Sequence, residues 1–376
     1  MTHEQSDEES ATAPPAGSAE PEEQVDESQR PARLATYMSG LSRDVIVDIA
    51  LIGALGLLLL IFGIASSGRE FIYANIIQIV DSGAILGLVT IGEVIVMISG
   101  ALDISVGSNA GLVTAVVAEI SLNSHLPLGV AIVLGLLAGS LAGAFNGFVV
   151  AYLRISAVIA TLATFSAFSG LALLLTNGNE VGVTSSFLAS LGTGSVASVP
   201  YLVIIFLVVT ALAILAMRFT LQGHNVYAVG GSGTASRLAG IRVSRYLLGV
   251  FVVSGFCAAI AGIMLLGQTG TAQPTEGSVG LELTAITAVL LGGTGLTGGT
   301  GTVFGAFLGV MVLSTLDNGL LLVGVQAFWQ QVATGALLLI GVILQDVGGH
   351  RARWQMLRAA RRRIDPEELL SWEEEQ

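Results

Sequence analysis

The chain has 376 residues, of which 53% are hydrophobic and only 11% are charged, and its formal net charge is -12. A soluble domain carries about 25% charged residues, so this composition excludes an ordinary soluble protein. All 15 basic residues are arginine, and the absence of lysine excludes the usual phosphate-binding loop of ATPases, which needs a lysine to reach the phosphates.

Residues 1–44 are predicted to form an acidic, disordered cytoplasmic tail. Residues 1–29 hold nine acidic residues and no basic one. The rest of the chain therefore has a net charge of only -3, out of -12 for the whole. Such a segment cannot bury enough apolar surface to fold. It also lacks the basic start and apolar core of a signal peptide.

Apolar segments of about 20 residues, the length that crosses a bilayer as a helix, recur through the rest of the chain. We therefore predict an all-α, polytopic transmembrane helical bundle over residues 45–347. The 48 glycines suit helices that pack closely in a membrane, and the strict alternation of a transmembrane β-barrel is not seen. The ten predicted spans are 45–65, 76–98, 106–123, 127–153, 156–176, 200–217, 246–267, 281–293, 302–322 and 328–347.

The arginines predict the orientation of these spans, because cytoplasmic connections carry an excess of basic residues. With ten spans and the N-terminus inside, 14 of the 15 arginines fall on the cytoplasmic side, and only Arg69 falls outside. Both termini are thus predicted to be cytoplasmic, in a bacterial inner membrane. The C-terminal tail, residues 348–376, begins with an arginine-rich stretch that suits anionic headgroups.

Two connections between the predicted spans are long. Residues 177–199 form an outer loop of polar and small residues. Residues 218–245 form the longest internal cytoplasmic segment, in which Gly-Gly-Ser-Gly precedes a stretch compatible with a short helix. A segment this long inside a compact membrane domain is usually functional.

Several stretches, in the same order, resemble the ribose-type permeases of binding-protein-dependent ABC sugar importers. This resemblance implies the fold of a type II-like ABC importer permease. It also implies a second permease chain, separate ATPase subunits that use ATP and Mg, and an extracytoplasmic sugar-binding protein. The stretches are GEVIVMISGALDISVGSNAGL (92–112), NGFVVAYLRISAVIATLATFSAFSGLALLLTNG (146–178), YAVGGSGTASRLAGIRV (227–243), QPTEGSVGLELTAITAVLLGGTGLTGGTGTVFGA (273–306) and LDNGLLLVGVQAFWQQVATGALLLI (316–340).

The resemblance gives segment 218–245 the role of coupling the spans to the ATPase. Closure of the ATPases must be transmitted by something rigid that projects from the permease. Ser232 stands where the family usually has asparagine, which leaves open which ATPase subunit fits. The alternative is a flexible loop whose glycines only turn the chain. The predicted docking residues are Tyr227, Gly230, Gly231, Arg237, Leu238 and Gly240.

Polar residues within the apolar spans are candidates for the translocation path. An ionisable group at membrane depth costs at least about 2.5–3.5 kcal/mol, so it should face protein or water. Glu93 lies deepest, and either lines the path or makes a hydrogen bond between helices. Asp103 either caps the cytoplasmic start of the third span or marks a broken helix that meets the solute. The uncharged candidates, which would bond sugar hydroxyls or neighbouring helices, are Asn146, Thr161, Thr164, Asn318 and Gln330.

These features predict a permease subunit that translocates a pentose, a hexose or a related polyol. The alternatives are an ABC permease for nucleosides or amino acids, and a secondary transporter driven by an ion gradient, with Glu93 and Asp81 as ion carriers. An enzyme is disfavoured, because the four histidines are scattered without metal-ligand spacing. No catalytic residue, metal, resident cofactor or nucleic acid is expected, and the single cysteine, Cys257, excludes a disulfide within the chain.

Overall fold

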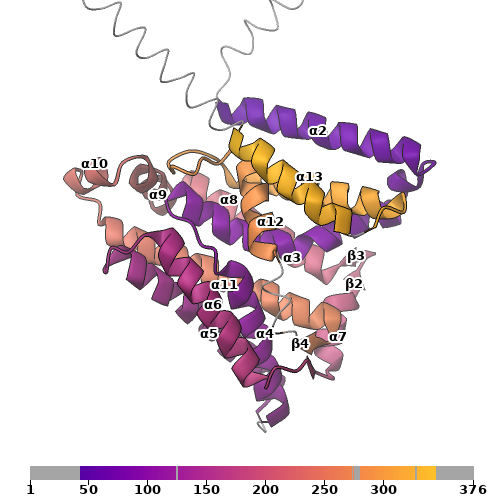
Figure 1. The fold of residues 1–376 in the computed structure, drawn as a ribbon, viewed down its shortest axis with the longest axis horizontal. Coiled ribbons are helices and arrows are strands. Elements are labelled where there is room, and N and C mark those ends of the chain that lie inside the picture. The colour runs from indigo at the N-terminus through magenta and orange to yellow at the C-terminus, as the bar shows by residue number, and fades with distance from the viewer. Residues whose placement is uncertain (1–42, 124–125, 273, 275–279, 327, 344–376) are drawn as a thin grey trace, which may run out of the picture. The chain divides into compact units, whose positions relative to one another are not determined.

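The computed structural model describes residues 43–123, 126–272, 274, 280–326 and 328–343, which are mostly helical (Figure 1). The predicted tail 348–376 and most of the tail 1–44 lie outside these residues. Arg43 and Asp44 already belong to the first helix, so the tail was predicted two residues too long. The elements are α2 (Arg43–Ala65), η2 (Arg69–Phe71), α3 (Tyr73–Ile98), α4 (Val106–Asn123), α5 (Leu128–Ala151), α6 (Ala157–Leu175), β1 (Val181–Gly182), α7 (Ser186–Thr193), β2 (Ser195–Val196), β3 (Val199–Pro200), α8 (Tyr201–Phe219), α9 (Leu221–Gly231), α10 (Gly233–Leu238), α11 (Val243–Thr269), β4 (Thr271–Ala272), α12 (Leu281–Leu291), α13 (Val303–Leu322) and a last helix, Phe328–Ile343.

Each predicted span coincides with a helix, which confirms the all-α polytopic bundle. Within the described part of the chain, 7 helices are long and apolar enough to cross a membrane: α2, α3, α5, α6, α8, α11 and α13. Helix α12 ends two residues before the predicted end of its span, 281–293. Its 11 residues extend about 16 Å, roughly half of a hydrocarbon core. A glycine-rich loop at 292–301 continues the chain beyond it.

Helices α3 and α11 form the centre of the bundle. The most apolar stretch of α3 is 83% buried and that of α11 is 61% buried, whereas that of α2 is only 11% buried. Leu88 and Ile91 of α3 belong to the same core cluster as Phe206 of α8 and Phe251 of α11. Helix α2 lies beside α13 (Figure 1) and exposes apolar side chains such as Ile64, so it suits a lipid-facing position.

Small residues bring α5 and α11 into close contact. Glycines recur every four residues on α5, which places them along one helix face, as in small-xxx-small membrane packing. Gly255 of α11 lies against this face: a Cβ there would meet the Gly139 carbonyl oxygen and lie 2.9 Å from the Gly143 Cα. The backbone of α5 therefore leaves no room for a side chain at Gly255.

This packing gives a testable difference between two glycines of α11. Gly255→Ala is expected to lower the free energy of unfolding by about 1–3 kcal/mol, because an added methyl group would overpack the contact with α5. Gly249→Ala is the matched control, since a Cβ there meets nothing within 4 Å. It should raise stability by about 0.5–1 kcal/mol, through the helix preference for alanine. Thermal unfolding in detergent measures both, and equal effects would contradict the packing.

The outer connection 177–199 is more ordered than its composition predicted. It contains α7, whose Leu188 is 1% exposed and whose N-cap Ser185 accepts a hydrogen bond from the Leu188 N–H at 3.4 Å. Strand β1 pairs with β4, and β2 pairs with β3. The predicted loop of polar and small residues thus includes a short helix, which one buried leucine and close glycine contacts with α11 anchor.

Candidate functional site

The chain breaks between α3 and α4 and folds back into the core. The Asp103 N–H donates to Glu93 Oε1 at 3.2 Å. Glu93 lies five residues before the end of α3, or about 7.5 Å back along the helix axis. Residues 99–105 therefore re-enter the bundle, and α4 begins inside it rather than at its surface.

The Asp103 carboxylate is the centre of a buried hydrogen-bond network. Its Oδ1 accepts from the Ser105 N–H at 3.1 Å and from the Ser105 hydroxyl at 2.7 Å, and its Oδ2 accepts from the Ser254 hydroxyl of α11 at 3.0 Å. Asn146 of α5 donates to Ser105 Oγ at 2.7 Å. Asp103 is 2% exposed and Glu93 is 0% exposed. The break is thus held by side chains from α3, α5 and α11, away from solvent.

Thr161 adds helix α6 to this network. Its Oγ1 accepts from the Ile104 N–H at 3.1 Å and lies 2.8 Å from the Ala157 carbonyl oxygen, to which it donates. A free backbone N–H in a buried turn is costly, so this hydroxyl helps to stabilise the break. Glu93, Asp103, Asn146 and Thr161, predicted separately, thus lie together around one chain break.

Asp103 does not cap α4, which was one of the two roles that the sequence left open for it. The Ser105 carbonyl accepts the first helical hydrogen bond of α4, from the Asn109 N–H at 2.8 Å, so Ser105 holds the N-cap position. The Asp103 carboxylate bonds Ser105 and α11 instead of the first turn of α4. The Asp103 carboxylate therefore links different helices, because the fold-back places it beside three other helices.

Three buried side-chain oxygens near the break have no hydrogen-bond partner among the described residues: Glu93 Oε2, Asn109 Oδ1 and Asn146 Oδ1. All three are acceptors, the carboxylate oxygen in its ionised form. A buried acceptor without a donor costs about 1–3 kcal/mol, so such positions suit a solute or solvent that supplies hydroxyl groups.

The remaining path candidates take no part in the hydrogen bonds described above. Thr164 bonds within its own helix, to the Ala160 carbonyl at 3.2 Å. Gln330 donates to the Asp317 carbonyl at 3.2 Å, and Asn318 neighbours Asp317 near the far end of α13. The structure therefore separates Asn318 and Gln330 from the chain break.

A cavity of about 440 Å³ lies near this second group, between α3, α11, α12 and α13. Ser82, Thr284, Ser314 and Asp317 supply its polar groups. Sequence reasoning missed Ser314 and Asp317, although Asp317 satisfies the rule that selected Glu93: an ionisable residue within an apolar span.

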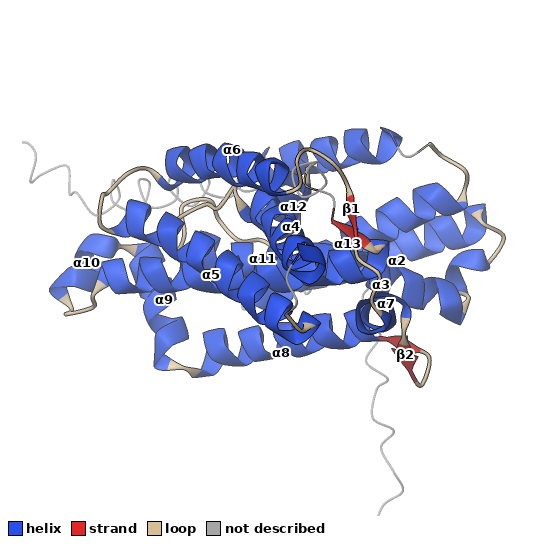
Figure 2. Ribbon diagram, turned by 90° about the horizontal axis from the view of Figure 1, so that it is seen from below, coloured by secondary structure: helices blue, strands red, loops and turns tan. Residues whose placement is uncertain are grey.

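Segment 218–245 folds as two short helices, α9 and α10, which lie at the opposite end of the bundle from β1 and β2 (Figure 2). Helix α9 was not predicted from the sequence. Gly230 and Gly231 end this helix, rather than opening a flexible stretch. The Thr220 hydroxyl accepts from the Gly223 N–H at 3.1 Å, which caps the start of α9.

The inner side of α9 is tied to the spans by Tyr227 and Gly230. The Tyr227 hydroxyl donates to the Gly301 carbonyl at 2.9 Å. Burial, and then the Asp44 carboxylate, raise the pKa of this phenol, so it stays a protonated donor. Gly230 packs against the Ile98 carbonyl, which itself accepts from the Gly299 N–H at 2.8 Å. We call this contact of α9, the end of α3 and the 292–301 loop the glycine junction.

The other predicted docking residues lie on the surface. Gly231, Arg237 and Gly240 are exposed, and Leu238 is 87% exposed. Among the described residues, the neighbouring Arg237 donates only to the Thr234 hydroxyl of its own helix, at 3.4 Å. The predicted set therefore divides: Tyr227 and Gly230 contact the permease itself, Gly231 lies against Gly299 through its backbone, and Arg237, Leu238 and Gly240 face outward.

A bundle of apolar spans around a buried polar chain break, with an exposed helix pair at one end, fits a polytopic helical membrane permease. Residues 75–342 match the family model described as branched-chain amino acid transport system / permease component, which covers more than half of the chain. The chain belongs to this family, and within it to the ribose-type permeases of ABC sugar importers, which confirms the resemblance seen in the sequence.

Three relatives illustrate the relationship. The ribose import permease protein RbsC of Haemophilus influenzae is 34% identical over 279 residues, covering 73% of this chain and 86% of the relative. The autoinducer 2 import system permease protein LsrC of Enterobacter sp. (strain 638) is 39% identical over 269 residues, covering 72% and 78%. The xylose transport system permease protein XylH of Escherichia coli K12 is 30% identical over 375 residues, covering 84% and 95%. No solved structure matches the chain.

Proposed function

We propose that the chain translocates a monosaccharide, a pentose, a hexose or a related polyol, as the membrane subunit of an ABC importer. The observation that carries the proposal is the direct contact between the exposed helix pair and the buried break: Ile98, which packs on Gly230, is followed at once by the fold-back at residues 99–105. The names of the relatives, which import ribose, xylose and autoinducer 2, support a small polyhydroxylated solute.

In this mechanism a separate ATPase, which uses ATP and Mg, docks on Arg237, Leu238 and Gly240. Its closure pushes α9, and the glycine junction passes this movement to the end of α3. The break then moves relative to α5, α6 and α11 and opens a route through the bundle. Glu93 and Asn146 offer free acceptors there to the hydroxyl groups of the solute. Asn318 and Gln330 would meet the solute nearer the outer end.

The proposed transporter contains two further parts, a binding protein and a second permease chain. An extracytoplasmic binding protein delivers the solute and supplies the affinity, so the route itself needs no tight site. A second copy of the permease completes the pore. The arginine distribution supports cytoplasmic termini, and in that orientation α9 and α10 lie on the side where ATP is available.

Solute uptake into proteoliposomes tests the proposal, with the partner ATPase and the binding protein each added or withheld. Uptake should require internal ATP and both partners, and it should be lost on replacement of Arg237 and Gly240. Glu93→Gln should keep uptake within a few-fold, because an amide oxygen still accepts from the Asp103 N–H. Uptake by the chain alone, driven by a pH or sodium gradient and abolished by Glu93→Gln, would instead establish a secondary transporter.

A further inference from the structure

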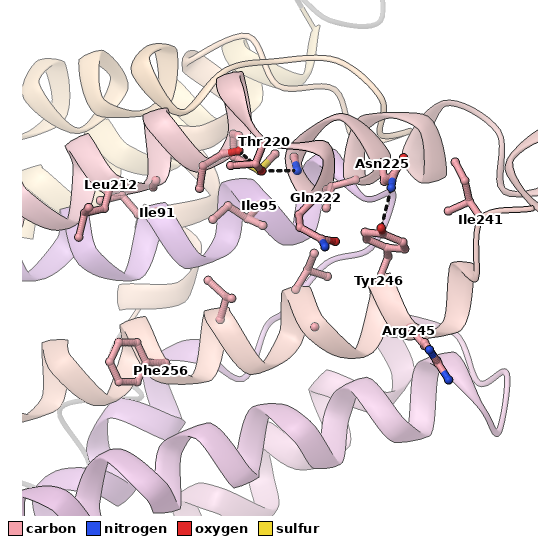
Figure 3. A pocket seen from close by; sticks show the side chains of 18 of the residues that line it. Ile91, Ile95, Leu212, Thr220, Gln222, Asn225, Ile241, Arg245, Tyr246 and Phe256 are labelled. Atoms are coloured by element: carbon pink, nitrogen blue, oxygen red, sulfur yellow. Dashed lines mark hydrogen bonds between the residues drawn. The ribbon is translucent and has the colours of Figure 1, made fainter.

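A larger cavity, of about 860 Å³, lies between α3, α8, α9 and α11, apart from the chain break. Figure 3 shows Leu212 and Phe256 toward one end of it, and Asn225 and Tyr246 at the other. Leu212, Val253 and Phe256 line the cavity and are 61%, 41% and 44% exposed. Exposed apolar side chains within spans face lipid, so the cavity is a groove that opens sideways to the bilayer.

The groove covers the depth of one leaflet. From Arg245 to Phe256, α11 advances about 16 Å at 1.5 Å per residue. Half of a hydrocarbon core is about 15 Å. The polar end is formed by α9 and the start of α11, which are cytoplasmic in the predicted orientation, so this leaflet is the inner one.

The polar end carries positive charge without a matching negative charge. Arg242 and Arg245 line it, both exposed, together with the neutral Gln222, Asn225 and Tyr246. Asn225 donates to the Tyr246 hydroxyl at 2.6 Å, which joins α9 to α11 at this end (Figure 3). No acidic residue is among the described residues that line the groove.

We propose that this groove binds an anionic phospholipid of the inner leaflet, with an acyl chain along α8 and α11 and the headgroup phosphate at Arg242 and Arg245. Basic pockets between spans on the cytoplasmic side suit such headgroups. A sugar suits the groove less well than a lipid, because the long walls on α3, α8 and α11 offer mostly apolar groups. Since α9 forms part of the groove, the bound lipid would steady the helix that the proposed ATPase contact moves.

Native mass spectrometry of the full-length chain in detergent tests this, with phosphatidylglycerol and phosphatidylcholine offered in equal amounts. The chain should retain phosphatidylglycerol preferentially. Arg242→Gln with Arg245→Gln should lower that preference by about thirtyfold, or about fivefold for each arginine. Arg154→Gln, an exposed arginine of another connection that does not line the groove, should leave it unchanged. Val253→Trp, which fills the apolar part, should reduce retention of both lipids.

Equal retention of the two lipids by the unaltered chain would overturn the proposal. If Arg154→Gln lowered the preference for phosphatidylglycerol equally, the preference would come from general surface charge, and this result would overturn the proposal too. If Val253→Cys, in a Cys257→Ala background, cross-links two chains in membranes, a second copy occupies the groove instead. Circular dichroism and gel filtration check that each variant is folded, and the binding readout does not depend on transport.

Discussion

Gly230→Ala is expected to abolish coupled transport, lowering ATP-dependent uptake by about a hundredfold or more. A Cβ at Gly230 would collide with the Ile98 carbonyl oxygen and lie 2.6 Å from the Gly299 nitrogen. These are backbone atoms, which cannot turn aside as a flexible side chain can. Overpacking that destabilises this contact by about 3 kcal/mol lowers the population in which the glycine junction is formed by about a hundredfold.

The neighbouring glycine supplies the matched control. Gly231 also lies in the last turn of α9, and a Cβ there meets nothing within 4 Å. Gly231→Ala should therefore leave uptake within about twofold, although it changes helix propensity as Gly230→Ala does. The measurement is uptake in proteoliposomes with both partners present, beside thermal unfolding of each variant. Normal uptake by a folded Gly230→Ala protein would show that force does not pass through this contact.

Helix positions were predictable because lipid imposes a simple rule on the sequence. Each span needs about 20 apolar residues, and each such run stands out from the connections. The rule fails for α12, where 11 residues extend only part of the way. The short helix α7 was not predicted either, because one buried leucine, Leu188, gives too weak a hydrophobic pattern in a polar loop.

The candidate site was predictable residue by residue, but not as an arrangement. Glu93 and Asp103 were visible as carboxylates in apolar surroundings, and Asn146 and Thr161 as polar groups within spans. Their meeting point depends on the fold-back of residues 99–105, which no periodicity announces. Ser254 and Ser105 were missed because a serine in a glycine-rich span has no distinctive pattern, although each holds the Asp103 carboxylate.

The division of the docking residues has a physical cause as well. A glycine in a cytoplasmic segment is compatible with a flexible turn or with a close helix contact, and sequence alone does not distinguish the two. In the structure a Cβ at Gly230 would collide with backbone atoms, whereas a Cβ at Gly231 would meet nothing within 4 Å. In the proposed mechanism, the exposed Leu238 and Arg237 receive the ATPase and Gly230 passes the movement inward.

The second large effect is expected at Asp103, whose replacement by alanine should lower the free energy of unfolding by about 3–5 kcal/mol. Three donors lose their acceptor: the Ser105 N–H, the Ser105 hydroxyl and the Ser254 hydroxyl. Each buried donor left unpaired costs about 1–3 kcal/mol, and breaking a buried charged network costs about 3–5 kcal/mol. Unfolding titrations in mixed detergent micelles give the difference.

Two milder variants separate this network from simple loss of volume. Asp103→Asn keeps the shape and one acceptor oxygen for Ser105, and the Ser254 hydroxyl can turn to accept from the new amide, so the cost should fall to about 1 kcal/mol. Ser254→Ala removes one hydrogen bond and should also cost about 1 kcal/mol. If Asp103→Ala costs no more than Ser254→Ala, the carboxylate does not hold the break. The fold-back must then be maintained by other contacts, such as those of Glu93, Thr161 and Asn146.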